Sequence, residues 1–283
     1  MKTVIISFIV LIGSALSAQN SKLELIYNQI PPLQDKFLCE NAEYYTEEMA
    51  LFESLTNQIE EMRIQLNEAL KKNGDETYNI ISAGFPTDEE LIEVEKLSEE
   101  GQRAFWKKME EDQTRIEKTI ASNNIKYQAE KETLNKKVAD YQNELLAIAE
   151  EYSELNYKAG KVKSDKRQKI FNTCIENNSL TSYGKQQMEN ISVEFCSVVS
   201  PILLKKLRFE YGNLKQNMAL YRRLTVIELA EYSTLTEEVV SELNAELLDL
   251  NDLEILAQFV TNYKTLYDIL PGGIDNQNEN KYE

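Results

Sequence analysis

The stretch LNKKVADYQNELLAIAEEYSEL, residues 134–155, decides the fold class of this chain. Its apolar side chains recur in alternating steps of four and three residues, at Leu134, Val138, Tyr141, Leu145, Ile148, Tyr152 and Leu155. A repeat of 3.5 residues is the seam of a left-handed coiled coil, in which one helix buries its apolar stripe against another. The stretch therefore predicts a long helix with at least one helical partner.

The sequence on either side of this stretch extends the helix. No Gly or Pro occurs from Arg103 to Lys158, a run of 56 residues that would be about 84 Å long if straight. Thr87 and Glu90 have the spacing of a capping box, so we expect the helix to begin there and to run to about Ala159, before Gly160. The alternative is a bent series of shorter helices, because polar residues interrupt the stripe before Leu134.

The other glycines and prolines divide the chain into further helices, since the segments between them are rich in helix-forming residues. We expect helices at about 33–72, 164–177, 182–232 with a bend at Pro201, 236–249 and 252–270. Short connections favour antiparallel neighbours. The predicted fold is all-α: an elongated antiparallel helical bundle or coiled-coil hairpin with shorter C-terminal helices, forming a single domain over 19–270, with a flexible tail at 271–283.

Residues 1–18 have the pattern of a cleaved secretory signal peptide. Lys2 precedes an apolar run, and small residues at Ala15, Ser17 and Ala18 suit cleavage after Ala18, with cleavage after Ser17 as the near alternative. A retained membrane anchor is the other interpretation, but the run is shorter than the roughly 20 residues that span a bilayer. We therefore expect an exported protein, periplasmic or secreted, with no stable membrane span after cleavage.

The composition excludes several function classes. The chain has 283 residues, 42% of them hydrophobic, and its net charge of −17 argues against a nucleic-acid-binding protein. It has no histidine, which removes histidine-dependent catalysis and histidine metal ligands. Two paired carboxylates could catalyse sugar hydrolysis. Among 48 acidic residues, however, some will lie in pairs by chance, so such pairs do not indicate this activity. We predict no enzyme activity, no catalytic residue, no metal and no cofactor.

The three cysteines are Cys39, Cys174 and Cys196, and in an exported protein a disulfide is the default expectation. Cys174 and Cys196 lie on either side of the turn expected near residues 178–184, so this pair is the candidate disulfide. The alternative is that all three are small buried apolar side chains.

Basic residues cluster in an otherwise acidic chain, and this run is the candidate patch for an anionic partner such as a surface polysaccharide or a lipid headgroup. Its members are Lys158, Lys161, Lys163, Lys166, Arg167 and Lys169, and Arg222 and Arg223 belong to the same hypothesis. The alternative is solvated charge with no partner. A second cluster, Asp249 to Glu254, is interpreted as the start of a helix capped by Asp252 and not as a calcium loop.

Together these features predict a non-enzymatic exported protein that acts as a structural or partner-binding component of the cell envelope or exterior. Its partners are expected to be proteins, and the coiled-coil seam could also form a homo-oligomer. Two alternatives stay open: a periplasmic-type holdase chaperone, which would shelter unfolded chains between helical arms, and a membrane-active helical protein.

Overall fold

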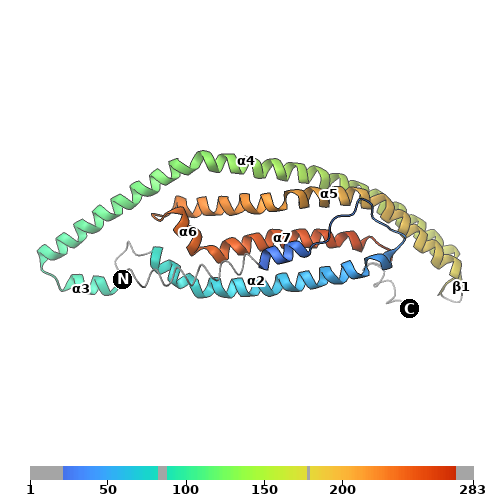
Figure 1. Ribbon diagram of the computed structural model, residues 1–283, viewed down its shortest axis with the longest axis horizontal. Coiled ribbons are helices and arrows are strands. Elements are labelled where there is room, and N and C mark those ends of the chain that lie inside the picture. Colours follow the sequence, from blue (N-terminus) through green and yellow to red (C-terminus); the bar gives the residue numbers. More distant parts are fainter. Residues whose placement is uncertain (1–21, 82–87, 177–178, 272–283) are drawn as a thin grey trace. The chain divides into compact units, whose positions relative to one another are not determined.

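A computed structural model of the chain describes residues 22–81, 88–176 and 179–271, and these residues form an all-α fold (Figure 1), as predicted. Residues 22–29 are helical and the 3₁₀ turn η1 covers Ala42–Tyr45. The helices that follow are α2 (Thr46–Ile81), α3 (Asp88–Glu95), α4 (Glu99–Thr173), α5 (Ser182–Glu231), α6 (Glu237–Leu243) and α7 (Ala245–Asp268). The predicted signal segment 1–18 lies outside the described residues, as does the predicted tail from residue 272.

The two longest helices, α4 and α5, pair in antiparallel directions. A two-residue antiparallel ladder joins them, formed by β1 (Ile175–Glu176) and β2 (Ser179–Leu180). Lys166 of α4 forms an ion pair with Glu194 of α5, and Glu151 of α4 forms one with Lys205 of α5. Residue numbers therefore rise along α5 as they fall along α4, which makes the two helices antiparallel. Such pairing is what the 3.5-residue seam predicted.

The predicted seam faces the partner helix along the second half of α4. Tyr127, Leu134 and Ile148 are buried, and the other seam residues from Val138 to Leu155 are half-buried. Trp106, in the first half of α4 where polar residues interrupt the apolar pattern, is exposed. The regular 3.5-residue repeat therefore predicted burial correctly, and the interrupted pattern before it did not.

The residues fall into two compact units, and four helices contribute to both. The described part of unit 1 comprises residues 61–81, 88–138 and 218–252, and that of unit 2 comprises 22–60, 139–176, 179–217 and 253–271. Each of α2, α4, α5 and α7 therefore supplies one portion of its length to each unit.

The core of unit 1 is formed by α4, α5 and α6. Its buried cluster consists of Tyr127, Leu134, Leu220, Leu224, Ile227, Ala230 and Val240, with Val138, Leu229 and Leu235 packed against it. Asn123 closes the end of this cluster, because its side-chain amide donates to the carbonyl oxygens of Ala230 and Ser233 where α5 ends.

The core of unit 2 contains a cluster of aromatic rings. Phe52 of α2 is fully buried, and its ring centroid lies 4.5 Å from that of Tyr263 and 5.7 Å from that of Tyr267, both on α7. The Tyr267 hydroxyl donates to Glu48 at 2.6 Å, and burial together with this carboxylate raises the pKa of Tyr267. Tyr267 thus buries its ring and places its hydroxyl on a polar partner.

The predicted start of the first helix was wrong. The helix begins at Thr46 and not near residue 33, because residues 31–41 form an irregular segment that inserts Phe37 and Cys39 into the core. It also continues past Gly74 to Ile81.

The predicted end of the long helix was also wrong. α4 continues through Gly160 to Thr173 and absorbs the short helix expected at 164–177. A glycine inside a helix costs only about 1 kcal/mol, and Leu155 and Val162 on either side of Gly160 pack toward α5 and keep the helix intact. At its other end the predicted helix is interrupted between Glu95 and Glu99, which separates α3 from α4.

Candidate functional site

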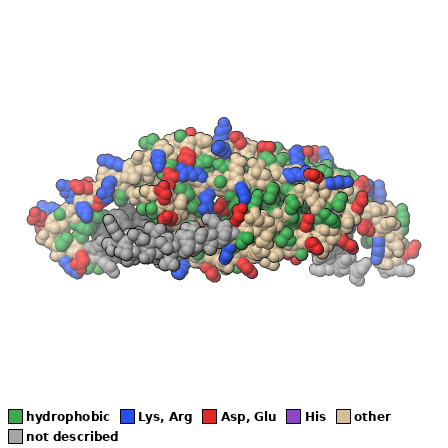
Figure 2. All heavy atoms as spheres, viewed as in Figure 1, with side chains coloured by type: hydrophobic (Ala, Val, Ile, Leu, Met, Phe, Trp, Pro, Cys, Tyr) green, Lys and Arg blue, Asp and Glu red, His purple; other side chains and the backbone are tan. Residues whose placement is uncertain are grey.

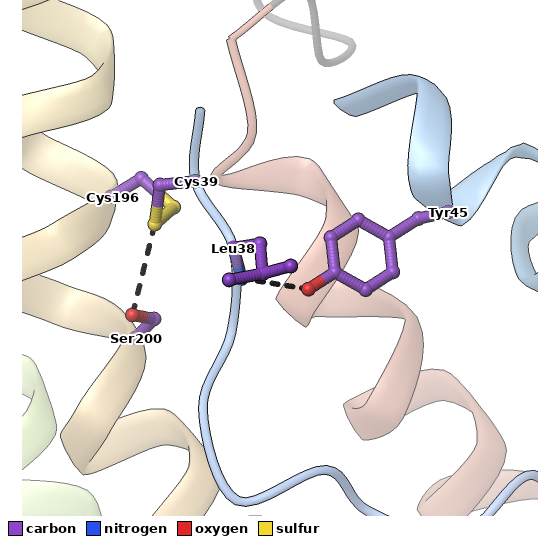
Figure 3. Close-up of a disulfide and its surroundings, with 5 residues drawn as sticks. All are labelled: Leu38, Cys39, Tyr45, Cys196 and Ser200. Atoms are coloured by element: carbon purple, nitrogen blue, oxygen red, sulfur yellow. Dashed lines mark hydrogen bonds between the residues drawn. A yellow bond between two sulfur atoms is a disulfide. The ribbon is translucent and has the colours of Figure 1, made fainter. Parts of the chain in front are cut away.

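The disulfide joins the irregular segment before α2 to α5 (Figure 3). Cys39 and Cys196 are bonded, with Cα atoms 5.7 Å apart and both side chains buried. The Sγ atom of Cys39 also lies 3.8 Å from the hydroxyl oxygen of Ser200, one helical turn beyond Cys196. Next to it the Leu38 amide donates to the hydroxyl of Tyr45 at 2.7 Å, so the segment is fixed by a covalent bond and a hydrogen bond.

The predicted pairing of Cys174 with Cys196 is wrong. Cys174 follows the last residue of α4, whereas Cys196 lies 14 residues after the start of α5, about 21 Å along the helix axis. A disulfide requires Cα atoms within roughly 7 Å, so two cysteines at such different heights cannot bond. Cys174 is unpaired and half-buried, and its Sγ lies 3.6 Å from the hydroxyl oxygen of Thr173.

The α4–α5 hairpin turns tightly beside Cys174. A Cβ atom added to Gly184 would lie 2.9 Å from the Cβ of Cys174, closer than real Cβ contacts. By contrast, a Cβ added to Gly160 would meet nothing within 4 Å. Glycine is therefore required in the first turn of α5, where it faces Cys174, and at residue 160 it leaves open space.

The predicted basic patch forms the last turns of α4 and not a loop. Lys158, Lys161 and Lys169 are exposed, whereas Lys163, Lys166 and Arg167 are half-buried. Lys166 contacts both carboxylate oxygens of Glu194, at 2.6 and 2.5 Å, and the Lys163 ammonium lies 4.6 Å from the centre of the Phe195 ring. The six residues are thus spread around the helix, with part of the run packed on α5.

An apolar groove lies where this basic run meets α5, within unit 2. Its cavity volume is about 230 Å³. The apolar lining is formed by Leu155, Ala159 and Val162 from α4 and by Ile191, Phe195 and Val198 from α5. The charged residues that line the groove are Lys158, Lys163, Lys166 and Glu194. The sequence analysis identified the lysines but not the groove, because the α5 wall comes from a distant part of the chain.

Exposed apolar side chains continue around this end of the hairpin. We define the hairpin end as residues 155–198, and its exposed large apolar side chains are Tyr157, Val162, Phe171, Ile175, Tyr183 and Val198. Tyr157 is 74% exposed and Tyr183 is 63% exposed. Figure 2 shows such hydrophobic side chains at the surface of α4 and α5, with Lys and Arg side chains among them.

The two arginines of the anionic-partner hypothesis are bound within unit 1. Arg223 forms ion pairs with Glu130 of α4 and Glu237 of α6. Hydrogen bonds from Arg223, Tyr127 and Lys126 lower the pKa of Glu237 to about 2. Arg223 therefore joins three helices of the unit and is not a surface charge that awaits a partner.

Arg222 forms ion pairs with Asp249 and Asp252, which lie inside α7. The prediction that Asp252 caps a helix is therefore wrong. The break between α6 and α7 falls at Asn244. Burial outweighs the attraction of the guanidinium and raises the pKa of both carboxyl groups, that of Asp252 to about 6. One oxygen of each, Asp249 Oδ2 and Asp252 Oδ1, is buried without a hydrogen-bond partner.

Within the described ranges no group of histidine, cysteine and carboxylate side chains is arranged to hold a metal ion. Over the same residues, no helix carries an apolar run long enough to cross a bilayer.

Comparisons with known proteins give no family, because no family model, no curated protein and no solved structure matches this chain. The function must therefore be inferred from the chain itself.

Proposed function

We propose that this chain is a non-enzymatic exported helical-bundle protein that acts as a partner-binding component of the cell envelope or exterior, and that it binds through the hairpin end. The observation that carries the proposal is the set of exposed apolar side chains at that end, Tyr157, Phe171 and Tyr183 among them. Exposed apolar groups gathered on one part of a surface are typical of interaction sites. Tyrosine in particular is enriched among the residues that dominate binding energy.

The charge of the hairpin end supports a partner with an acidic surface. Residues 155–198 contain seven basic and four acidic side chains, a net charge of +3 in a chain whose total is −17. Opposite charges across an interface accelerate association and select against wrong partners. The rest of the chain, with a net charge of −20, would repel the same partner, so binding would be directed to this end.

Export is supported by two independent features. Residues 1–18 have a signal-peptide pattern. The Cys39–Cys196 disulfide agrees with it, because disulfides persist in oxidising compartments outside the cytosol. Sequencing the N-terminus of the protein recovered from the host tests this part of the proposal, and the expected first residue is Gln19.

Affinity capture with the full chain tests binding through the hairpin end. The test variant replaces its three largest exposed apolar side chains, Tyr157→Ser with Phe171→Ser and Tyr183→Ser. The matched control changes exposed apolar residues elsewhere, Ile64→Ser with Ile92→Ser and Ile125→Ser. We expect one stoichiometric partner, retained by the control and lost by the test variant.

Equal capture by both variants would contradict a role for the hairpin end. Suppression of the aggregation of many unrelated clients would instead indicate a holdase, and release of dye from lipid vesicles would indicate a membrane-active protein. Either result would replace the proposed function.

A further inference from the structure

The apolar groove of the hairpin end exists because a small side chain stands in one of its walls. Ala159 occupies the middle of the α4 wall, between Leu155 and Val162, and across from it α5 presents Ile191, Phe195 and Val198. Elsewhere on this seam α4 carries large side chains such as Tyr141 and Ile148. A methyl group at position 159 leaves a cavity of about 230 Å³ where a larger residue would fill the space.

Cationic groups line one edge of this groove. Lys158, Val162 and Lys166 follow one another at intervals of four residues, so they form a single row along α4. Lys163 lies over the ring of Phe195, and Glu194 is the one acidic residue among those lining the cavity in the described part of the chain. The groove therefore combines an apolar floor with a positive edge, in a chain that is strongly acidic elsewhere.

The size of the cavity limits what can occupy it. Its volume exceeds the ~150 Å³ of an engineered apolar cavity that holds benzene, and it is below the ~300–1,000 Å³ of sites that enclose drug-sized ligands. The walls extend from Leu155 to Lys166 along α4, a distance of about 16 Å. A narrow, elongated apolar space of this kind fits a single alkyl chain.

We propose that this groove binds a single-chain fatty-acid carboxylate. The alkyl chain lies along the apolar floor, and the carboxylate lies at the Lys158–Lys166 row. Charge complementarity selects an anionic headgroup. Lys166 is paired with Glu194 and Lys158 with Glu154. Neither ion pair prevents this, because all four side chains are about half exposed or more and surface ion pairs contribute little. This inference goes beyond the proposed function and does not depend on the partner protein.

Calorimetric titration of the full chain with dodecanoate, below the concentration at which it forms micelles, tests the proposal. We expect saturable binding at one site, and at least tenfold weaker binding of dodecyltrimethylammonium, which has the same tail and the opposite charge. Vesicles of an anionic phospholipid form a separate arm of the experiment. If the chain binds these vesicles, we expect dodecanoate to compete for that binding.

Two pairs of variants separate the groove from the rest of the helix. Ala159→Leu fills the cavity and should weaken dodecanoate binding at least tenfold, whereas Gly160→Leu, which points into open space, should not. Lys158→Gln with Lys166→Gln should weaken binding several-fold. Lys161→Gln with Lys169→Gln removes the same charge from the same helix outside the groove and should leave binding unchanged.

Circular dichroism and sedimentation of each variant complete the test. Absence of dodecanoate binding by the wild-type chain, equal binding of the cationic amphiphile, or equal losses in test and control variants would each overturn the proposal. A change of assembly mass in Ala159→Leu would also overturn it, because a second copy of the chain would then be the occupant of the groove.

Discussion

Removing the Cys39–Cys196 disulfide should strongly destabilise the folded chain. The two cysteines are 157 residues apart in sequence, so the bond closes a very long loop. In the chain-entropy account, a closed loop of this length destabilises the unfolded chain by about 5 kcal/mol. The double variant Cys39→Ala with Cys196→Ala should therefore lower the free energy of unfolding by up to that amount.

Urea unfolding, followed by the helical circular-dichroism signal, measures the effect. Cys174→Ala is the matched control, because it also removes a thiol but breaks no disulfide. We expect the unfolding midpoint of the control to stay within the range of an ordinary substitution, and that of the double variant to fall strongly. Reduction of the wild-type disulfide should reproduce the fall.

Two results would refute this reasoning. The first is a double variant whose midpoint equals that of Cys174→Ala. The second is a peptide map of the oxidised chain that places Cys174 in a disulfide, since Cys174 then could not be the free thiol described above.

Three further outcomes follow from packing and charge. Gly184→Ala should destabilise the chain by about 1–3 kcal/mol in thermal unfolding because its Cβ has no room at the hairpin turn, whereas Gly160→Ala should stabilise by up to about 1 kcal/mol. Phe52→Ala should cost about 3–5 kcal/mol, since this ring is fully buried, and the exposed Ile64→Ala on the same helix should cost little. Burial raises the pKa of Asp252 to about 6, so the folded chain holds this proton more tightly than the unfolded chain and loses stability as the pH rises from 4 to 7. Relative to Asp252→Asn, the loss in urea unfolding should approach 3 kcal/mol, and a pH-independent difference would contradict the assignment.

The long helices could be predicted because their signal is local. The stripe from Leu134 to Leu155 repeats over several turns, and each side chain on it needs only a facing helix to be buried. The helix boundaries were less predictable, because a distant contact decides whether a weak residue ends the helix. Gly160 stays helical within α4, while residues 31–41 form no helix because Phe37 and Cys39 reach the core.

The features of the candidate site were missed for the same reason. Cys174 and Cys196 were expected to pair because they lie on either side of the turn near residues 178–184, and nothing in the sequence marked Cys39 as the partner of Cys196. Arg222 and Asp249 are 27 residues apart, and their contact exists only once α5 and α7 pack together. The groove likewise could not be predicted from the sequence, because it requires the walls of both α4 and α5, and Ala159 by itself is an ordinary helix residue.

The position of the one disulfide also determines which pieces a protease would release. The break between α3 and α4 contains Lys96 and lies between Cys39 and Cys196, so a chain cut there stays joined through sulfur. The break between α5 and α6, residues 232–236, lies outside the bridged interval, and a cut there frees the C-terminal fragment from any covalent tie. Under denaturing, non-reducing conditions a molecule nicked between α3 and α4 thus persists as one covalent species, whereas one nicked between α5 and α6 separates into two fragments.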